Sequence, residues 1–309
     1  MKKNLFNSAK FLIGFLFLFL ILRFLKVDNI NRILQVNYLY IILCFIATLL
    51  SFLTDTVRWK LISDEIAGRN TASLLSFLSI YLRTISLGQF ISQSGSLLVA
   101  RPIYMKKKYN FTYKESFITL FIEKVADLYY VFVFFLIFLF NFFFNNHWIT
   151  LSILLFIISS LIFIYKIQKI ERYIYWILKK IGKIKKKNAN IDLKKLEFHS
   201  YKKLAVLSII RFFTYGLRFF LLAKAINLSI SYTDILLGMP IAQLSLLFAF
   251  TPGALGVLEA GWSGVLKFFH YSNNTIGYFV LGFRFYWIVF SLVIYIISYM
   301  IKEKKVIKK

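Results

Sequence analysis

The sequence contains little cysteine, histidine, proline or acidic residue. Its 309 residues include one cysteine, three histidines, three prolines and 13 acidic residues. Because Cys44 stands alone, no disulfide can form within the chain. The histidines lie far apart, and no phosphate-binding loop, nucleophile elbow or zinc-protease motif occurs. These absences predict no metal site and no cofactor, and they favour a protein that is not an enzyme.

Hydrophobic residues dominate instead. They make up 59% of the chain, the mean hydropathy is +0.70, and they are grouped in long blocks. This pattern predicts an all-α, polytopic protein of the cell membrane. The net charge of +26 is concentrated between the apolar blocks, as the positive-inside rule and contact with anionic lipid predict. We therefore expect membrane lipids, mainly anionic ones, as partners, and no nucleic acid.

The apolar blocks predict about six full spans and two interrupted segments in a single transmembrane domain, residues 1–309. The spans are expected at 9–25, 36–53, 204–226 and 275–301, with two more between 115 and 165 around a turn at 145–148. Residues 54–70 mix acids and bases and predict a polar connector. The long basic stretch at 166–203 has isoleucines at three- and four-residue steps. It predicts a cytoplasmic connector with an amphipathic helix on the membrane surface, or alternatively a soluble connector helix.

One of the two interrupted segments is residues 246–264, inside a long apolar stretch near the C-terminus. Pro252 lacks an amide donor, and Gly253 and Gly256 each weaken a helix by about 1 kcal/mol. A helix is expected to stop near Thr251 and another to begin near Val257. Backbone groups freed at membrane depth are tolerated only where protein or a water-filled cavity satisfies them. The interruption therefore predicts a functional site.

The other interrupted segment is residues 71–100, where Gly88, Gly95 and neighbouring serines break the helical pattern. The basic regions at 101–114, 166–203 and the C-terminal tail are all expected in the cytoplasm. If so, both interrupted segments are re-entrant hairpins, and both chain termini are cytoplasmic. An alternative topology places the N-terminus outside and lets residues 71–100 span the membrane.

Re-entrant hairpins at these places divide the chain into two halves of opposite orientation, residues 1–145 and 146–309. Such an inverted repeat carries its broken segments at matching positions. In transporters built this way, the broken segments indicate a substrate site near the middle of the membrane.

Several ionisable residues fall within or beside the predicted spans and hairpins. A charge at the membrane centre costs about 2.5–3.5 kcal/mol on insertion scales, so each needs a partner or a wet cavity. The candidates for substrate binding are Arg83, Arg101, Glu123, Asp127, Glu259 and Arg284. The arginines are expected to attract an anionic headgroup, and the acids to pair with them or with a cationic headgroup. Arg211 and Lys124 are interpreted as structural ion-pair or interfacial residues.

Two groups of residues follow one another in a characteristic order. One contains Gly95 and Arg101, followed by a Glu-Lys-x-x-Asp motif at 123–127; the other is the run 251–259, followed by Arg284. Together they resemble the flippase-like family that includes the transmembrane region of lysylphosphatidylglycerol synthetases, the membrane part of bacterial multiple peptide resistance factors. The resemblance covers roughly residues 75–300. Ser96 stands where that family often has a glutamate. No soluble aminoacyl-transfer domain is expected here, so the resemblance does not imply lysyl transfer to lipid.

These observations lead to three functional hypotheses. The first is a flippase-like membrane protein that binds or translocates a lipid or lipid-linked substrate by alternating access. The second is a membrane-embedded enzyme, or an accessory subunit, in lipid or lipid-linked sugar modification, with Glu259 or Asp127 as general base. The third is a scaffold for a lipid-modifying enzyme partner that supplies the chemistry.

Overall fold

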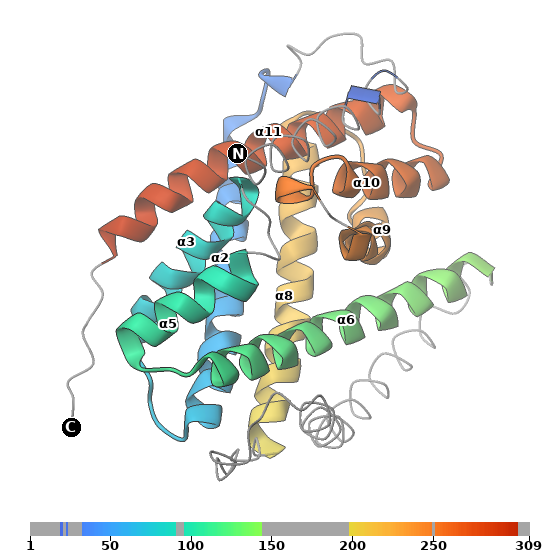
Figure 1. Cartoon of the computed structure of the whole chain (residues 1–309). Coiled ribbons are helices and arrows are strands. Elements are labelled where there is room, and N and C mark those ends of the chain that lie inside the picture. The colour runs from blue at the N-terminus through green and yellow to red at the C-terminus, as the bar shows by residue number, and fades with distance from the viewer. Residues whose placement is uncertain are drawn as a thin grey trace, which may run out of the picture.

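The computed structural model describes residues 33–90, 96–143, 198–248 and 251–301, together with residues 19, 20 and 23 (Figure 1). Every regular element in these ranges is a helix, which confirms the predicted all-α fold class. The predicted spans at 9–25 and 146–165, most of the 166–203 connector, the turn at 145–148 and Gly95 lie outside the described residues, apart from isolated positions.

Three of the described helices are long and apolar enough to cross a membrane. They are α2 (Tyr38–Ala67), α8 (Phe198–Ala225) and α11 (Asn273–Met300), of 30, 28 and 28 residues. At about 1.5 Å per residue, each exceeds the roughly 30 Å hydrocarbon core of a bilayer. Large apolar side chains such as Leu39 and Ile296 remain exposed on them, as lipid-facing residues would be. The chain is therefore a multi-pass membrane protein.

The helix α2 is longer than expected, and the prediction of a polar connector at 54–70 is wrong. The helix continues to Ala67 and ends at Gly68, whose left-handed backbone (φ 64°) lets its N–H reach the carbonyls of Asp64 and Glu65. Asp55 and Arg58 are buried inside this helix. Their charges were interpreted as the end of a span, but partners on other helices neutralise them, so the helix continues through them.

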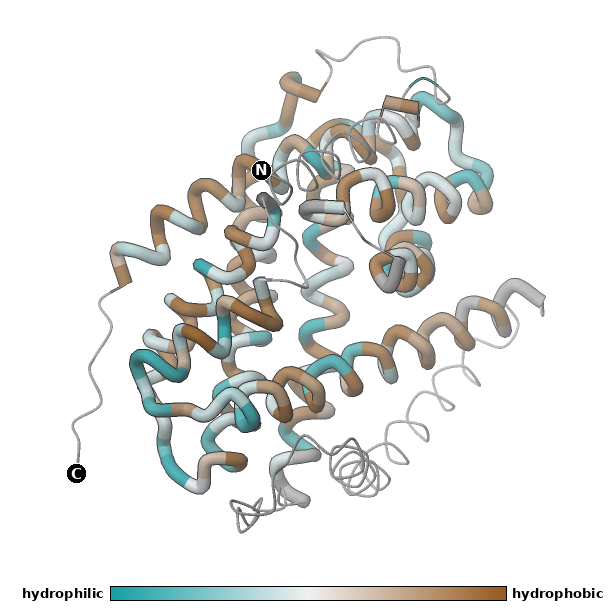
Figure 2. Tube along the Cα trace, viewed as in Figure 1, coloured by the Kyte–Doolittle hydropathy of each residue, from teal (hydrophilic) through white to brown (hydrophobic). Residues whose placement is uncertain are grey.

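The centre of the molecule is the pair α2 and α8, which pack along each other (Figure 1). The helix α3 (Leu74–Phe90) packs against α2 and α11, whereas α6 (Tyr113–Phe143) packs against α2 and α9. Hydrophobic positions dominate α6 and α11, while polar positions recur along α8 (Figure 2). Of these polar positions, Ser208 and Arg218 are buried between α8 and its neighbours.

The interrupted segment near residue 250 forms two short helices joined by tight turns. The helix α9 (Tyr232–Leu244) is followed by the 3₁₀ turns η4 (Ser245–Phe248) and η5 (Pro252–Ala254), and then by α10 (Val257–Phe268). The predicted restart at Val257 is confirmed, but the first helix ends at Leu244, earlier than the predicted Thr251. At about 1.5 Å per residue, helices of 13 and 12 residues reach only part of the way across a bilayer.

The interrupted segment at 71–100 has a similar form. After α3 ends at Phe90, the chain continues through η2, a single π-helical turn (Ser96–Ala100), into α5 (Arg101–Tyr109). Gly88, predicted to break the helix, lies inside α3, which ends two residues later at Phe90. The predicted basic connector at 101–114 is largely helical, because α5 ends at the left-handed Asn110 (φ 57°) and α6 begins at Tyr113.

Candidate functional site

We call α3 to α5 the first hairpin and α9 to α10 the second. Residues 251–256, which include η5 and lead into α10, form the break of the second hairpin. Gly253 (φ 58°), Ala254 (φ 55°) and Gly256 (φ 83°) all have positive φ, which turns the chain sharply before α10 begins. The Thr251 hydroxyl donates to the Leu255 carbonyl at 2.7 Å, and the Ala254 N–H donates to the Thr251 carbonyl at 3.1 Å. Some of the backbone hydrogen-bonding groups of the break are therefore paired within the break itself.

A buried ion pair holds this break to the last helix. Glu259 on α10 is fully buried and accepts a 2.8 Å hydrogen bond from the Gly256 N–H at the start of its own helix. Its other oxygen pairs with the guanidinium of Arg284 on α11. Arg284 also donates to the Gly253 carbonyl at 3.1 Å. The two residues predicted to act together thus fix the turn and α11 in one position.

The second hairpin break touches the end of α3 in the first hairpin. A Cβ atom at Gly253 would lie 2.8 Å from the carbonyl oxygen of Gln89 and 3.3 Å from its side-chain oxygen. Only a residue without a side chain permits this approach. Two segments more than 150 positions apart in the chain therefore meet at Gln89 and Gly253.

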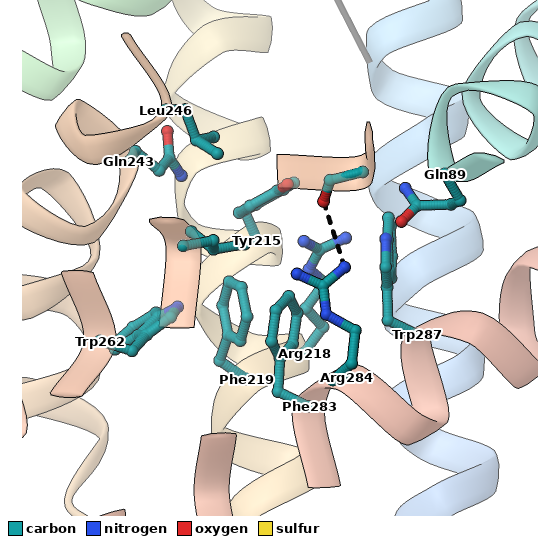
Figure 3. A pocket seen from close by; sticks show the side chains of 12 residues that line it. Gln89, Tyr215, Arg218, Phe219, Gln243, Leu246, Trp262, Phe283, Arg284 and Trp287 are labelled. Carbon is teal, nitrogen blue, oxygen red and sulfur yellow. Dashed lines mark hydrogen bonds between the residues drawn. The ribbon is translucent and has the colours of Figure 1, made fainter. Parts of the chain in front are cut away.

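A cavity opens where these segments meet (Figure 3). It holds about 420 Å³ of empty space, part of it open to the outside. Besides Gly253, its lining consists of Gln89 from α3, Tyr215, Arg218 and Phe219 from α8, Gln243, Leu246, Leu258 and Trp262 from the second hairpin, and Phe283, Arg284 and Trp287 from α11. Both hairpins and two long helices thus contribute to its wall.

Arg218 is the least compensated charge in this wall. Its guanidinium carbon lies 3.5 Å from the ring centre of Tyr215 and 4.4 Å from that of Trp287, and the residue is only 4% exposed. Among the described residues it forms no ion pair, and its Nη1 has no hydrogen-bond partner. Arg284, beside it in Figure 3, is neutralised by Glu259.

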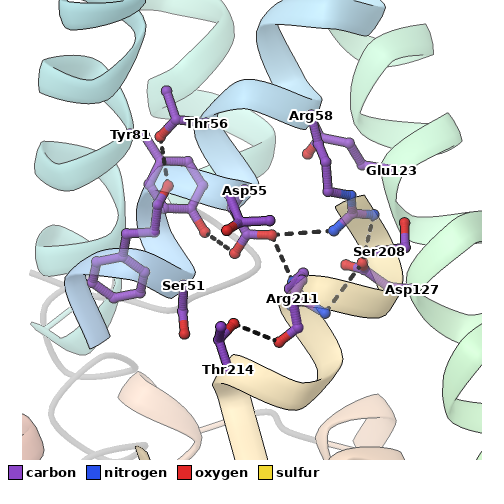
Figure 4. Close-up of polar contacts among 12 residues, drawn as sticks. Ser51, Asp55, Thr56, Arg58, Tyr81, Glu123, Asp127, Ser208, Arg211 and Thr214 are labelled. Atoms are coloured by element: carbon purple, nitrogen blue, oxygen red, sulfur yellow. Dashed lines mark hydrogen bonds and ion pairs between the residues drawn. The ribbon is translucent and has the colours of Figure 1, made fainter. Parts of the chain in front are cut away.

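A second cluster of charges ties together α2, α3, α6 and α8 (Figure 4). Asp55 accepts hydrogen bonds from Arg58 at 3.1 Å and from the Tyr81 hydroxyl at 2.7 Å, and it pairs with Arg211 at 2.6 Å. Asp127 pairs with Arg58 at 2.9 Å and with Arg211 at 3.3 Å. Each of these two acids is thus shared between the same two arginines.

Arg101 and Glu123 extend this cluster towards the first hairpin. They form a two-pronged ion pair at 2.9 and 3.2 Å, which joins α5 to α6. The Arg101 guanidinium also lies 3.6 Å from the ring centre of Trp59. The three acids and three arginines of this second cluster, of which Asp127 and Arg211 are only half-buried, neutralise one another. A network of this kind positions helices rather than attracting a charged ligand.

The second cluster borders another cavity, which Asp55, Glu123, Asp127 and Arg211 help to line. Its empty space is about 470 Å³, part of it open to the outside. Tyr215 and Trp287 line this cavity as well as the one at Arg218. The two cavities therefore share these two aromatic side chains, and Arg218 stacks against both of them.

The predicted substrate-binding residues fall into three places. Glu259 and Arg284 lie at the hairpin break, while Arg101, Glu123 and Asp127 belong to the charge cluster. Arg83 belongs to neither: it donates to the Ser298 carbonyl at 3.1 Å and stacks on Tyr299 with its guanidinium 4.4 Å from the ring centre. Arg211, interpreted from the sequence as an ion-pair residue, does form ion pairs.

Sequence reasoning overlooked several of the residues that line the cavities. Asp55 and Arg58 were placed in a connector, and neither Gln89 nor Tyr81 was singled out. Arg218 was not among the predicted site residues, although it lies seven positions after Arg211 and therefore on the same face of the helix. That spacing was the available signal, since it directs both arginines of α8 into the bundle. Within the described ranges, no cluster of three or more histidines, cysteines or acids is arranged to hold a metal ion.

Comparison with known proteins gave one family. Residues 7–301 match the model of the lysylphosphatidylglycerol synthase TM region. Neither the curated proteins nor the solved structures contain a match to the chain. The match covers almost the whole sequence and includes both hairpins and all the residues discussed above. The chain therefore belongs to the lysylphosphatidylglycerol synthase TM region family.

Proposed function

We propose that this protein binds a lipid or lipid-linked substrate where its two hairpins meet and translocates it across the cytoplasmic membrane. The observation that carries the proposal is the contact of the break at Gly253 with the end of α3 at Gln89, directly beside a cavity lined by arginines. Breaks that meet at membrane depth serve substrate binding in transporters with inverted repeats. Membership of a lipid-related membrane family supports a lipid as the substrate.

The packing of the helices supports an inverted repeat. The first helix of each hairpin packs against the last helix of the other half: α3 against α11, and α9 against α6. Within each half, an Arg–Glu pair joins the second hairpin helix to the last helix. These pairs are Arg101–Glu123 and Glu259–Arg284, with the acid and the base exchanged. We therefore also propose that residues 1–145 and 146–309 are the two halves of the repeat. Together they would form about six spans and two re-entrant hairpins, with both chain termini in the cytoplasm.

Alternating access requires that the substrate pass from one cavity to the other. The side chains of Tyr215 and Trp287 line both cavities. We place the moving boundary at these two rings, because they line both cavities while the ion pairs around them fix the helices. The predicted site residues Arg101, Glu123, Asp127, Glu259 and Arg284 then act mainly by holding the site in shape.

The arrangement favours translocation over catalysis. A general base must be free to accept a proton, whereas Glu259 is held by Arg284 and Gly256, and Asp127 by Arg58 and Arg211. If Glu259→Gln abolished product formation by the purified protein, the enzyme hypothesis would gain support instead. Co-purification of a lipid-modifying enzyme would support the scaffold hypothesis.

Translocation is tested in liposomes that contain the purified protein and lipids with a fluorophore on one acyl chain. A membrane-impermeant reductant bleaches only the outer leaflet, so transport increases the bleached fraction beyond one half. We expect faster loss of fluorescence than in protein-free liposomes for at least one anionic headgroup. Equal rates with and without protein across anionic, zwitterionic and sugar headgroups would contradict the proposal.

A further inference from the structure

We propose that the hydrogen bond from the Tyr81 hydroxyl to Asp55 is a latch that keeps the cavity at the second cluster closed along α3. When this bond breaks, α3 moves away from α2 and takes the end of α11 with it. The inference rests on the proposed function and deepens it, because it names the contact that controls access to one of the two cavities. Its basis is the difference between the two faces of α3.

The face of α3 that packs on α11 is held by polar contacts. Ser79 and Arg83, one helical turn apart, both donate to the carbonyl of Ser298, at 3.3 and 3.1 Å. The Arg83 guanidinium also stacks on Tyr299, 4.4 Å from its ring centre. Two donors on one carbonyl and a stacked guanidinium fix the two helices relative to each other. We therefore expect α3 and this end of α11 to move as one unit.

The opposite face of α3 packs on α2 through aromatic rings around one hydrogen bond. Tyr81 and Phe77 meet Phe52 and Trp59 of α2 edge to face, with 5.7 and 4.5 Å between the ring centres. Packed side chains of this kind allow helices to slide by small amounts. The hydrogen bond from Tyr81 to Asp55, at 2.7 Å, instead requires one separation of the helices (Figure 4). This bond therefore sets how closely α3 lies on α2.

Asp55 can lose this bond without becoming an unpaired charge. It keeps its ion pairs with Arg58 and Arg211, at 3.1 and 2.6 Å. The freed Tyr81 hydroxyl lies in the wall of a cavity that is partly open to the outside, so water can replace the carboxylate as its partner. Separating Arg58 from its acids would instead leave a buried charge without a counter-ion, which is much more costly. The latch is therefore easier to break than the ion pairs around it.

Breaking the latch changes the cavity at the second cluster. Tyr81 and Ile85 of α3 and Trp287 of α11 all line it. Because α3 and α11 move together, these side chains withdraw from Tyr215 of α8, the other ring that both cavities share. The latch thus controls the boundary at Tyr215 and Trp287 where we place the movement of alternating access.

The test measures distances between pairs of spin labels in the full chain in liposomes. The buried Cys44 is replaced by serine, and cysteines for labelling are introduced at exposed positions. Labels at Leu53 and Leu75 report the separation of α2 and α3, whereas labels at Leu75 and Ile296 report that of α3 and α11. Tyr81→Phe removes the hydroxyl and keeps the ring.

We expect Tyr81→Phe to raise the ratio of long to short α2–α3 distances about 10- to 100-fold, the range for one hydrogen bond to a charged group. The α3–α11 distance should stay as in the wild type. Tyr286→Phe is the matched control, because it removes a hydroxyl that donates to the Ile33 carbonyl at 3.0 Å and leaves the latch intact. Its α2–α3 distances should equal those of the wild type.

Two results would overturn the inference. Unchanged α2–α3 distances in folded Tyr81→Phe would show that the bond is no latch, even if transport in liposomes is observed. A change in the α3–α11 distance as well would show that the two helices do not move as one unit. If Tyr81→Phe misfolds, Tyr81→Leu also removes the hydroxyl and replaces it in the test. Since no lipid transport is measured, failure of translocation in liposomes contradicts the proposed function separately.

Discussion

Gly253 sets how closely the two hairpin breaks approach each other. Gly253→Ala adds a Cβ that would lie 2.8 Å from the Gln89 backbone oxygen, at a residue with φ of 58°. Left-handed backbone alone costs about 1–2 kcal/mol for an alanine, and the contact also forces the breaks apart. We expect a lower thermal unfolding temperature and at least tenfold slower lipid translocation in liposomes.

Gly264→Ala is the matched control for this prediction. An added Cβ at Gly264, inside α10, meets no atom within 4 Å. Since alanine favours a helix over glycine by about 1 kcal/mol, this variant should be at least as stable as the wild type and transport normally. Normal transport by Gly253→Ala would show that the contact of the breaks does not matter.

The buried pair of Glu259 and Arg284 allows a double-mutant cycle. Arg284→Met leaves Glu259 buried without its counter-ion, which costs about 3–5 kcal/mol of stability. Adding Glu259→Gln removes the stranded charge, so the double variant should lose less than the sum of the single losses, with a coupling of about 1–3 kcal/mol. Denaturation in detergent measures all three. Strictly additive losses would contradict the pairing.

Individual residues were predictable where a local motif marked them. The proline and glycines of the break, and Glu259 one turn later, stand out in an apolar run. Arg284 was predicted as an ionisable residue of the last span and again through the family resemblance, and the structure supplies the physical reason, because it binds both Glu259 and Gly253. Gln89 belongs to no such motif, and Arg218 has only its seven-residue spacing from Arg211. Their position at the cavity depends on which helices pack together, and that arises from contacts distant in sequence.

At the scale of the elements, one carboxylate of α6 pairs with both helices of the central pair, in addition to the apolar packing between them. Asp127→Asn removes the charge that pairs with Arg58 of α2 and Arg211 of α8. We expect a loss of about 3 kcal/mol, because Arg58 remains buried and Arg211 half-buried with less compensation. Thermal unfolding followed by circular dichroism measures it.

Lys124→Gln provides the comparison for that variant. Lys124 lies on the same helix and also pairs with Asp127, at 3.2 Å, but half of its side chain is exposed. An exposed pair contributes about 0–1 kcal/mol, so this variant should unfold close to the wild type. A loss as large as that of Asp127→Asn would mean that burial does not set the strength of this network.

The boundaries of the elements were less predictable than their existence. The helix α2 continues past residue 53 because Asp55 and Arg58 find buried partners, which no property of the local sequence reveals. In contrast, α10 begins at the predicted Val257, because Gly256 and the Glu259 side chain cap it from within the same segment. Local chemistry fixes one boundary and tertiary contacts fix the other.

At the scale of the whole molecule, the two groups of buried charges have different roles. The neutral cluster at Asp55 and Asp127 joins four helices, while the cavity at Arg218 keeps one excess positive charge between the hairpins. Composition and charge placement were enough to predict a polytopic helical membrane protein. They did not distinguish these two groups, since both appear in the sequence as isolated ionisable residues in apolar surroundings.

The most direct test of the account is photolabelling with an anionic phospholipid that carries a diazirine on its headgroup. In liposomes with the wild-type protein, we predict labelled peptides from the cavity wall, around Gln89, residues 251–262 and 284–287. Labelling there should fall at least tenfold in Arg218→Gln and persist in Lys224→Gln, which removes the same charge from the same helix outside the cavity. Labels confined to exposed, lipid-facing positions such as Leu39 and Ile296, and unchanged by Arg218→Gln, would contradict a substrate site between the hairpins.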